Sequence, residues 1–434
     1  MVSGEFSNQP ADRGYHFLTE KAYLPPDFDE QTFNATWQVW PEPLRSRAAE
    51  ATPSERRRMA FERYGLTFRP DDDSGKPLQY VVDQQGQWTM NCFACHGGQV
   101  LGDTYPGLPN NRFALETLTE DIRKTKLQLG KPLSRMDVGS LFMPLGKTNG
   151  TTNAVMFGVA LMAYRDADLN VHPNRLPPKM VHHDMDAPPW WHFQRKEYIY
   201  IDGFAPKDAR PLMQFMLVEQ NGPEKFRQWE SDYQDVFEYI SSIKPPKYPF
   251  EIDAALAQKG LKIFEANCAE CHGTYGENAD YPGKMVSLDS VQTDPVRLSA
   301  LSEQHRAGYQ ASWFGRFGEK EVITNPTGYV APPLDGIWAS APYLHNGSVP
   351  TLWHLLHPSE RPAVWKRTEA EYDQIRIGLP IESWDRLPAE VTDAAVKRTY
   401  FDTGRFGMQA SGHDYPNQLD EQEKRAVLEY LKTL

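Results

Sequence analysis

All four cysteines of this 434-residue chain lie in two copies of one pattern, Cys-x-x-Cys-His. The first copy spans residues 92–96 (CFACH) and the second spans residues 268–272 (CAECH). This pattern attaches a c-type haem: the two thiols bond to the two vinyl groups on one edge of the macrocycle, and the histidine lies beneath the iron. The chain must therefore fold around two large, flat groups. We predict two covalently attached c-type haems with His96 and His272 as proximal iron ligands, held by Cys92, Cys95, Cys268 and Cys271.

Other uses of paired cysteines fit the spacing less well. A four-cysteine zinc site separates its two pairs by ~15 to 20 residues, far fewer than lie between Cys95 and Cys268. A thioredoxin-like redox site needs only one Cys-x-x-Cys pair. Two disulfides would leave the His-Gly that follows each pair unexplained.

Haem chemistry also carries an expectation about location. Covalent haem attachment in bacteria takes place outside the cytoplasmic membrane, so we expect the protein to be periplasmic or otherwise exported. The first residues, MVSGEFSNQPADRG, lack the basic start and the apolar region of a secretory signal. We therefore expect that a signal or an anchor was removed.

Charge and hydropathy exclude two classes of partner. The formal net charge is −12, whereas nucleic-acid binding draws most of its affinity from clustered Lys and Arg. The longest apolar runs, such as residues 156–164, fall well short of the ~20 residues that a membrane-spanning helix needs. We predict neither a nucleic-acid partner nor a membrane span.

The same order of elements surrounds each motif. Apolar residues at helical spacing in 253–266 predict a helix that ends at Cys268, and Asp420 with Glu423 predicts the N-terminus of a final helix. In the first half, Thr52-Pro53-Ser54-Glu55 predicts a capping box and a helix that ends at Gly65. Residues 231–243 predict the matching final helix. Strand-like QYVVD and QWTM around a Gln-Gln-Gly turn predict a hairpin before Cys92.

This order resembles a class I cytochrome c domain. The resemblance implies that Gly260 and Phe264 lie where the first helix crosses the last, with the glycine close to an aromatic residue such as Tyr430. The Pro-rich segment KPPKYPF after Ile243 cannot continue a helix. We predict a mainly α fold with two class I cytochrome c-like domains, each with long loops and short β-hairpins: an N-terminal extension at 1–51, a first domain at 52–246 and a second at 247–434.

The most distinctive stretch lies in the second half. Residues 341–348 (APYLHNGS), followed by Thr351-Leu352, resemble the signature of the superfamily that contains di-haem cytochrome c peroxidases, MauG-type enzymes and rubber oxygenases. Residues 281–297 (YPGKMVSLDSVQTDPVR) make the rubber-oxygenase branch the closest. The resemblance is strong over about 250–434 and weaker over 52–250, where it rests on the arrangement and the haem motifs.

The second haem has several candidate distal ligands. The loop before the final helix, GRFGMQASGHDYPNQ, offers Met408 and His413. Its Gly-His-Asp resembles the pattern of rubber-oxygenase relatives, in which this histidine ligates the second haem. We favour His413, and Met408, His345 or an open position remain alternatives. In the peroxidases the histidine equivalent to His345 is not a ligand, so we expect His345 to bond a propionate or another group near a haem. The peroxidases' distal Met is here Ser359.

The first haem is harder to complete. No histidine occurs between His96 and His172, unlike in bis-His peroxidases, which departs from their mechanism. The internal repeat makes Met213 a candidate ligand, with Met216 as its alternative, although the spacing of both equally fits a buried stripe. The rubber-oxygenase resemblance implies instead a five-coordinate iron. Residues 182–204 (HHDMDAPPWWHFQRKEYIYIDGF) then either line its distal side or form an aromatic packing loop.

Two functions follow. In the first, both irons are six-coordinate and the chain relays electrons between redox partner proteins. In the second, the chain is an oxidoreductase whose first iron is open to peroxide or dioxygen while the second haem relays electrons. Glu116, Glu120 and Asp121 are candidate acids downstream of the first motif, although we expect a solvated helix face there. No catalytic residue, substrate or named partner follows from the sequence.

Overall fold

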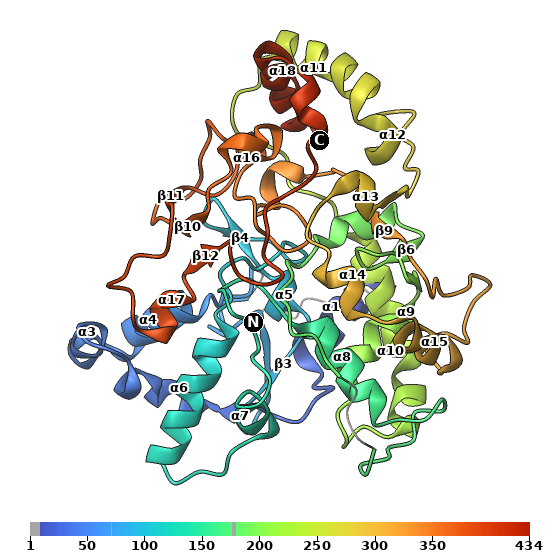
Figure 1. Cartoon of the computed structure of the whole chain (residues 1–434). Helices are drawn as coiled ribbons and strands as arrows, with labels where there is room; N and C mark the ends of the chain where they lie inside the picture. The colour runs from blue at the N-terminus through green and yellow to red at the C-terminus, as the bar shows by residue number, and fades with distance from the viewer. Residues whose placement is uncertain (1–8, 71, 176–178) are drawn as a thin grey trace.

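The computed structural model describes residues 9–70, 72–175 and 179–434. The fold is helix-rich with short antiparallel sheets, which is compatible with the mainly α prediction (Figure 1). The α-helices before the Pro-rich segment are α1 (Pro10–Glu20), α2 (Glu30–Ala35), α3 (Leu44–Glu50), α4 (Pro53–Tyr64), α5 (Phe93–His96), α6 (Leu115–Gln128), α7 (Arg135–Gly139), α8 (Ala154–Ala163), α9 (Ala209–Leu212) and α10 (Pro223–Ser242). Those after it are α11 (Ala254–Asn267), α12 (Ala269–His272), α13 (Leu288–Val291), α14 (Val296–Ala300), α15 (Glu303–Ala311), α16 (Leu352–Leu356), α17 (Ala394–Lys397) and α18 (Glu421–Leu431).

The strands form small sheets at the edges of the helical body. Two three-stranded sheets have the orders β1-β3-β2 and β11-β10-β12, and three further pairs are β4-β5, β6-β7 and β8-β9. Their bounds are β1 (Phe28–Asp29), β2 (Tyr80–Val82), β3 (Gln87–Met90), β4 (Gln99–Val100), β5 (Asp103–Thr104), β6 (Tyr198–Ile199), β7 (Ala205–Pro206), β8 (Met285–Ser287), β9 (Gly328–Val330), β10 (Val364–Arg367), β11 (Ile381–Trp384) and β12 (Tyr400–Asp402). The hairpin predicted before Cys92 is confirmed, since β2 and β3 pair antiparallel with Tyr80 opposite Met90.

In the second half, the first and last helices cross at a glycine. A Cβ atom on Gly260 of α11 would lie 1.9 Å from the carbonyl oxygen of Ala426 in α18, closer than any real contact. The Phe264 and Tyr430 rings meet beside this point with centroids 5.2 Å apart. The crossing at Gly260, Phe264 and Tyr430 is therefore confirmed.

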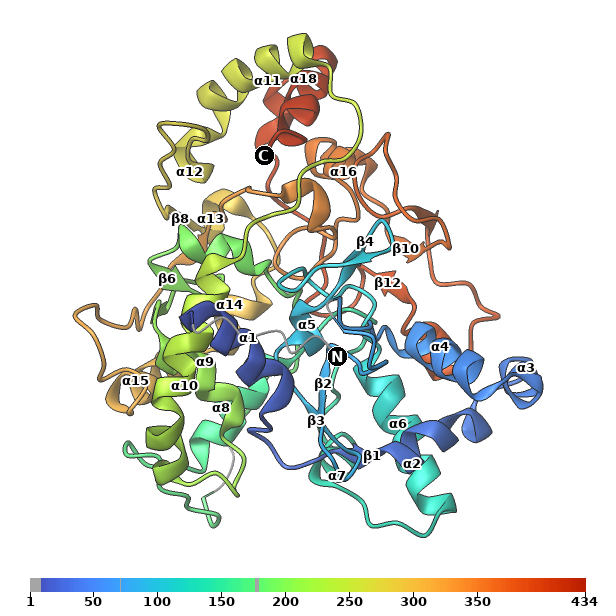
Figure 2. The same ribbon diagram turned by 180° about the vertical axis from the view of Figure 1, so that it is seen from behind.

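The first half has the same crossing, made by a different helix from the one predicted. A Cβ atom on Gly14 of α1 would lie 2.2 Å from the carbonyl oxygen of Asp235 in α10. Arg13 seals the contact with two hydrogen bonds of 2.7 Å to the Asp235 carboxylate. Both views show α1 lying across α10 (Figures 1 and 2). The helix that crosses α10 is therefore formed by residues 10–20, which we assigned to an N-terminal extension. The helix at 52–64 does not cross α10.

The helix at 52–64 belongs to a separate cluster. Its predicted capping box is confirmed in α4, where Thr52 and Glu55 bond reciprocally and Gly65 ends the helix with φ +65°. Its buried side chains pack with α2, α6 and the first sheet rather than with α10. The expected final helix at 231–243 also begins earlier, because Pro223 starts α10 and apolar residues continue its buried face from Phe226.

The hydrophobic cores cross the predicted domain boundary. One core joins residues before 246, such as Phe226, to residues after it, such as Tyr309 and Phe314. The other joins Leu108 and Trp191 to residues around α18. The residues near 244–250 form no helix, as expected. The division into two cytochrome c-like domains stays a prediction.

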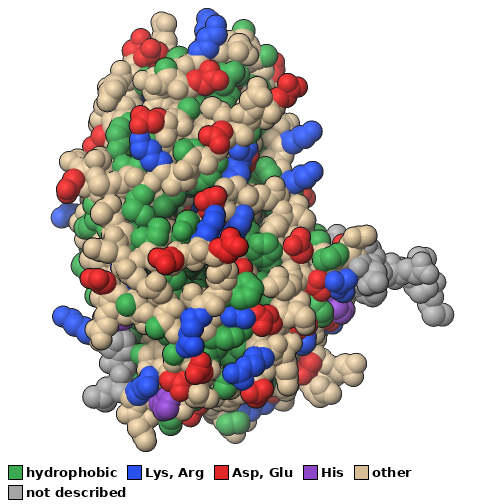
Figure 3. Space-filling model, turned by 90° about the vertical axis from the view of Figure 1, so that its right-hand side faces the viewer, with side chains coloured by type: hydrophobic (Ala, Val, Ile, Leu, Met, Phe, Trp, Pro, Cys, Tyr) green, Lys and Arg blue, Asp and Glu red, His purple; other side chains and the backbone are tan. Residues whose placement is uncertain are grey.

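The surface carries both signs of charge. On the face in Figure 3, acidic and basic side chains are interspersed with hydrophobic ones. Among the described helices, none has the length and apolar character needed to cross a bilayer.

The glycine crossing gives a prediction about stability. We expect Gly260→Ala to lower the free energy of unfolding by on the order of 1–3 kcal/mol, because the methyl group meets a backbone carbonyl that cannot move aside. The matched control is Gly308→Ala in α15, where a Cβ meets nothing within 4 Å. Better helix propensity should raise the stability of that variant by roughly 0.5–1 kcal/mol. Urea unfolding of the two variants measures both effects, and equal changes would contradict the crossing.

Candidate functional site

Backbone hydrogen bonds fix the first motif as a helical turn. Cys92 precedes α5, and the Asn91 side chain accepts a hydrogen bond of 2.9 Å from the Phe93 N–H. The Asn110 N–H donates to the Cys95 carbonyl at 2.9 Å and the Gly107 N–H to the His96 carbonyl. The glycine at 98 is needed because a Cβ there would lie 2.2 Å from the Pro109 carbonyl oxygen. The loop at 105–110 therefore presses directly on the motif.

The second motif grows out of a long helix. The Cys268 N–H donates to the Phe264 carbonyl at 2.7 Å, so α11 passes directly into the turn α12 that contains Cys271 and His272. Gly273 follows with φ +82°, and a Cβ there would lie 2.2 Å from the Asp280 carbonyl oxygen. A glycine after each histidine is thus explained by close backbone approach.

The four cysteines are free thiols, two in each of these turns. Burial raises the pKa of Cys92 to about 12 and that of Cys95 and Cys268 to about 11. Within the described ranges, no three His, Cys, Asp or Glu side chains converge as a metal site requires.

A backbone carbonyl orients His272, the histidine of the second motif. Nδ1 of His272 lies 2.8 Å from the carbonyl oxygen of Pro332. A carbonyl can only accept, so Nδ1 carries the proton and Nε2 keeps the lone pair for a metal. Burial lowers the pKa of His272, which keeps the ring neutral.

His96, the histidine of the first motif, lies near the carbonyl of Pro188, but the contact does not have the geometry of a hydrogen bond. Burial lowers the pKa of His96 to about 4, while the Pro188 carbonyl acts in the opposite direction. Nδ1 of His96 makes no hydrogen bond of good geometry. Pro188 and Pro332 occupy the same position in two Ala-Pro-Pro segments, 187–189 and 331–333. This repeat was visible in the sequence and would have identified both carbonyls.

His413 lies opposite His272. The centroids of the two rings are 6.1 Å apart with 65° between their planes. Two imidazoles on opposite sides of one metal ion, each with a bond of about 2 Å, have ring centres about 6 Å apart. Nδ1 of His413 is buried, so the accessible surface of this half-buried ring belongs to its other atoms. The spacing fits one iron between the two rings.

The backbone around His413 is fixed from both sides. His413 has φ +54°, and its N–H donates to the Val291 carbonyl at 2.7 Å. Arg361 donates two hydrogen bonds of 2.7 Å to the carbonyls of Ala410 and Gly412. Burial lowers the pKa of His413 to about 3, and the neighbouring His272 and Arg361 lower it further. The ring is therefore neutral, the form in which an imidazole can bind a metal.

The four histidines proposed near haems share an unusual environment. Protein surrounds each of them closely enough to lower its pKa, yet each ring keeps accessible surface. Thiol pairs beside neutral, partly accessible imidazoles fit a covalently held haem at each motif. The four residues are His96, His272, His345 and His413.

The alternative ligands of the second haem lie elsewhere. Met408 is 0% exposed and packs in the hydrophobic core. The His345 ring packs on Tyr329 with centroids 4.5 Å apart. Burial lowers the pKa of His345 to about 3, with a further contribution from Arg297. The role of His345 beside a propionate stays a prediction.

Arg297 belongs to a buried charge cluster between the halves. Asp202 accepts hydrogen bonds from Arg297 at 3.0 and 3.2 Å and from Arg306 at 2.7 Å, and all three side chains are almost inaccessible. One carboxylate thus holds two guanidinium groups. The cluster joins the segment before β7 to α14 and α15. Its Arg297 is also a neighbour of His345.

The side chains considered as ligands of a first haem are buried or half-buried. Met213 is 0% exposed and Met216 is 4% exposed, both within the hydrophobic core. Nδ1 of His183 bonds the Val181 carbonyl and Nδ1 of His182 bonds Asn153, while Nε2 of each is buried. The ring recorded against His96 is Trp190, stacked at 4.8 Å. Met213 as a ligand stays a prediction.

An apolar helix borders the first motif instead. Thr152 hydrogen-bonds the Cys95 thiol and precedes α8, in which every side chain is apolar. Most residues of α8 keep accessible surface, although a helix that is apolar on all sides is normally buried. This surface suits contact with a macrocycle.

Asp186 is an acid that the sequence analysis passed over. It interacts with Cys95, its N–H donates to the His345 carbonyl at 3.0 Å, and burial raises its pKa well above the usual range. Burial therefore favours the neutral form of this carboxyl group, which lies beside the first motif and keeps some accessible surface.

The acids predicted as a solvated face have structural roles. Asp121 is buried and accepts hydrogen bonds from Arg63 and Tyr64. Glu120 pairs with Arg398, and Glu116 accepts from the Leu145 N–H at 2.7 Å. The expectation of a solvated face is wrong for Asp121, because α6 packs that side against α4.

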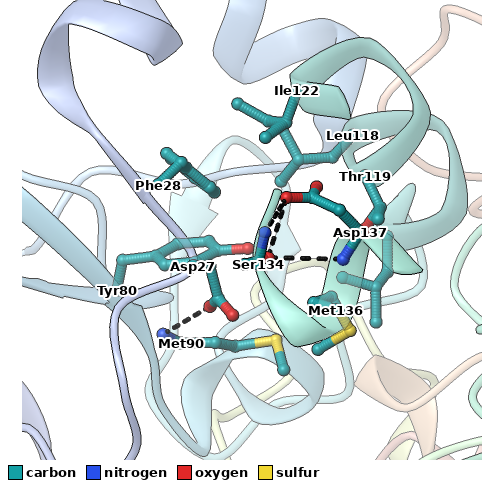
Figure 4. Close-up of a pocket in the computed structure, with 11 residues that line it drawn as sticks. Asp27, Phe28, Tyr80, Met90, Leu118, Thr119, Ile122, Ser134, Met136 and Asp137 are labelled. Atoms are coloured by element: carbon teal, nitrogen blue, oxygen red, sulfur yellow. Dashed lines mark hydrogen bonds between the residues drawn. The ribbon is translucent and has the colours of Figure 1, made fainter. Parts of the chain in front are cut away.

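A small cavity lies between the first sheet, α6 and α7. Figure 4 shows Asp27, Tyr80 and Met136 around it, with Asp27 bonded to the Met90 N–H. Its volume of about 10 Å³ suits one water molecule. Burial raises the pKa of Asp27 to about 7. The cavity is too small for a substrate.

The second half contains a segment that is similar to a cytochrome c-like family. Residues 328–366 match a family described as RoxA-like, cytochrome c-like. A cytochrome c-like domain implies a covalently bound c-type haem and a haem-based redox function. The match covers β9, the turn with His345 and most of β10.

Two curated relatives extend the similarity. The uncharacterized protein y4iM of Sinorhizobium fredii (strain NBRC 101917 / NGR234) is 31% identical over 286 residues, which cover 57% of this chain and 64% of that protein. The uncharacterized protein y4iJ of the same strain is 27% identical over 261 residues, or 45% of this chain and 42% of that protein. The chain spans less than two thirds of the length of either relative.

The buried cluster gives a testable prediction. We expect Asp202→Asn to destabilise the protein by ~3–5 kcal/mol, because it leaves two buried guanidinium groups without a counter-charge. As a control, Glu224→Gln breaks the exposed pair with Arg227, whose effect should stay below ~1 kcal/mol. Thermal unfolding of both variants measures the difference. A loss for Asp202→Asn no larger than that of the control would contradict the role of the cluster.

Proposed function

We propose that this chain is a di-haem c-type cytochrome with a redox function. One haem is held by Cys92 and Cys95 with His96 as proximal ligand, and the other by Cys268 and Cys271 with His272. A covalently held haem supplies one-electron chemistry at its iron. The proposal includes redox partner proteins as electron donor and acceptor, and an exported location.

The observation that carries the proposal is the His272–His413 pair. Its ring separation of 6.1 Å supports a six-coordinate second haem, and the carbonyl of Pro332 fixes the tautomer of one ring. Two imidazole ligands favour a lower potential than an imidazole with a methionine. A closed coordination sphere suits an electron relay, since no position is left for a substrate.

A second candidate function is a haem enzyme whose first iron is open to peroxide or dioxygen. The packing of Met213 favours it, because this side chain has no accessible surface and lies within a hydrophobic core, where its thioether is not available to an iron. In this function Asp186, whose neutral form is favoured by burial, would be the acid nearest the first motif, and a haem held there would supply the redox chemistry.

The ligand of the second haem can be tested by substitution. We expect His413→Ala to convert one of the two haems from low spin to high spin, because it removes the ring that lies opposite His272. Visible and EPR spectra of the ferric holoprotein measure the change. Met408→Leu is the control and should leave both spectra unaltered, since Met408 is packed in the core.

Haem content tests the attachment of the first haem. Cys95→Ala should lower the content below two haems per chain, and an unchanged content would refute the first site.

The state of the first iron separates the two functions. A resting high-spin signal that changes on addition of hydrogen peroxide and persists in Met213→Leu would support the enzyme. In that case Asp186→Asn should slow the peroxide reaction by roughly 10²–10⁴-fold, with cyanide binding retained. Two low-spin signals, one of which becomes high spin in Met213→Leu, would support the relay alone.

A further inference from the structure

The exposed apolar side chains of this protein are concentrated in one short segment. Among the described residues, eleven large hydrophobic side chains are exposed, and six of them lie within positions 127–142. Phe142 is 85% exposed, Leu127 64% and Leu141 61%. Single exposed apolar residues are normal, but a cluster of them marks an interaction site. The six are Leu127, Leu129, Leu133, Val138, Leu141 and Phe142.

These side chains lie on one protruding tip, made of the end of α6, the link to α7, α7 itself and the residues that follow. Arg123 ties the two helices together through hydrogen bonds to the Asp137 carbonyl and the Ser140 hydroxyl at 2.8 and 2.7 Å. Lys126 adds a buried ion pair with Asp137. Both ribbon views have α6 and α7 at the end of the molecule opposite α11 and α18 (Figures 1 and 2).

The exposure follows from which face of α6 is used for packing. Leu118 and Ile122 point into the cluster around α4 and the first sheet. Leu127 lies on the opposite side, beyond Arg123 and Lys124, where no element covers it. The tip is therefore rigid, and its apolar side chains point outwards from a structured base.

The charge around these side chains is one-sided in sequence. Residues 122–136 contain no Asp or Glu, although the whole chain has a net charge of −12. Lys126 forms a buried ion pair with Asp137, and Lys124, Lys131 and Arg135 pair with Asp121, Asp29 and Glu219. Such partly exposed pairs are weak in water. The five cations are Arg123, Lys124, Lys126, Lys131 and Arg135.

We propose that this tip, residues 123–142, binds the surface of an anionic lipid bilayer. Phe142, Leu141 and Leu127 insert at the boundary between head groups and acyl chains, and Lys124 and Arg135 lie among the lipid phosphates. Protruding Leu and Phe side chains beside Lys and Arg are the composition of interfacial membrane-binding segments. The proposal concerns a site apart from both haem motifs and does not depend on the function proposed for them.

Two other occupants fit the tip less well. A second copy of the chain would bring two cation-rich tips together, and like charges repel. Lysine is depleted at protein–protein interfaces, whose core is a close-packed patch rather than single protruding side chains. A lipid surface takes up both features at once.

The experiment is co-sedimentation of the holoprotein with vesicles. We expect binding to vesicles of phosphatidylglycerol and phosphatidylcholine, and much weaker binding to phosphatidylcholine alone. The double variant Leu141→Ser/Phe142→Ser should weaken binding by at least ~10-fold, because it removes the inserted side chains. Lys124→Gln/Arg135→Gln should lower affinity for the anionic vesicles by on the order of 10-fold and reduce its dependence on salt.

The matched control is Ile375→Ser/Phe406→Ser, which removes two similarly exposed apolar side chains elsewhere, 84% and 59% accessible. It should bind vesicles like the unaltered protein. Absence of binding to anionic vesicles would overturn the proposal, as would equal losses in the control and tip variants. Concentration-dependent dimerisation that the tip variant abolishes, without vesicle binding, would assign the tip to a second copy. Unchanged haem spectra and thermal midpoints establish that the variants are folded.

Discussion

A close crossing of first and last helices is the constraint on which both halves depend. In each half a glycine lets one helix touch the backbone of another: Gly14 meets Asp235, and Gly260 meets Ala426. Any side chain at these points would push the helices apart. In the second half the consequence is direct, because α11 continues into the turn with Cys268 and His272. The direction of the proximal histidine is thereby set by how tightly two helices pack some distance away.

The two halves are also braced against one another, so that neither site is an independent unit. Asp202 holds Arg297 and Arg306 across the junction, and the Asp186 N–H bonds the His345 carbonyl. Breaking a buried ion pair leaves an uncompensated charge, which makes relative movement of the halves costly. Distances between groups in the two halves are therefore fixed by charge pairing as well as by the shared hydrophobic cores.

Local signals in the sequence predicted the second half better than the first. Gly260 and Phe264 lie directly before Cys268, so one helical pattern revealed the crossing. Gly14 has the same role, but a long insertion separates it from Cys92, and the helix that is closer in sequence, α4, attracted the assignment. The Ala-Pro-Pro repeat was legible in the chain. Asp186 was not, because its raised pKa and its neighbours exist only once distant segments are folded together.

The two proposed haem sites differ in the rearrangement that binding of a sixth ligand to the iron would require. His413 already faces His272, and its left-handed backbone is held by Arg361, so ligation costs no further rearrangement. Met213 has no accessible surface, and its side chain fills part of a hydrophobic core. Moving a buried methionine out of its packing costs on the order of 2–5 kcal/mol, as for its replacement by alanine. An iron–thioether bond would have to exceed that cost. Packing therefore supports His413 as a ligand of the proposed second haem and disfavours Met213 as a ligand of the proposed first one.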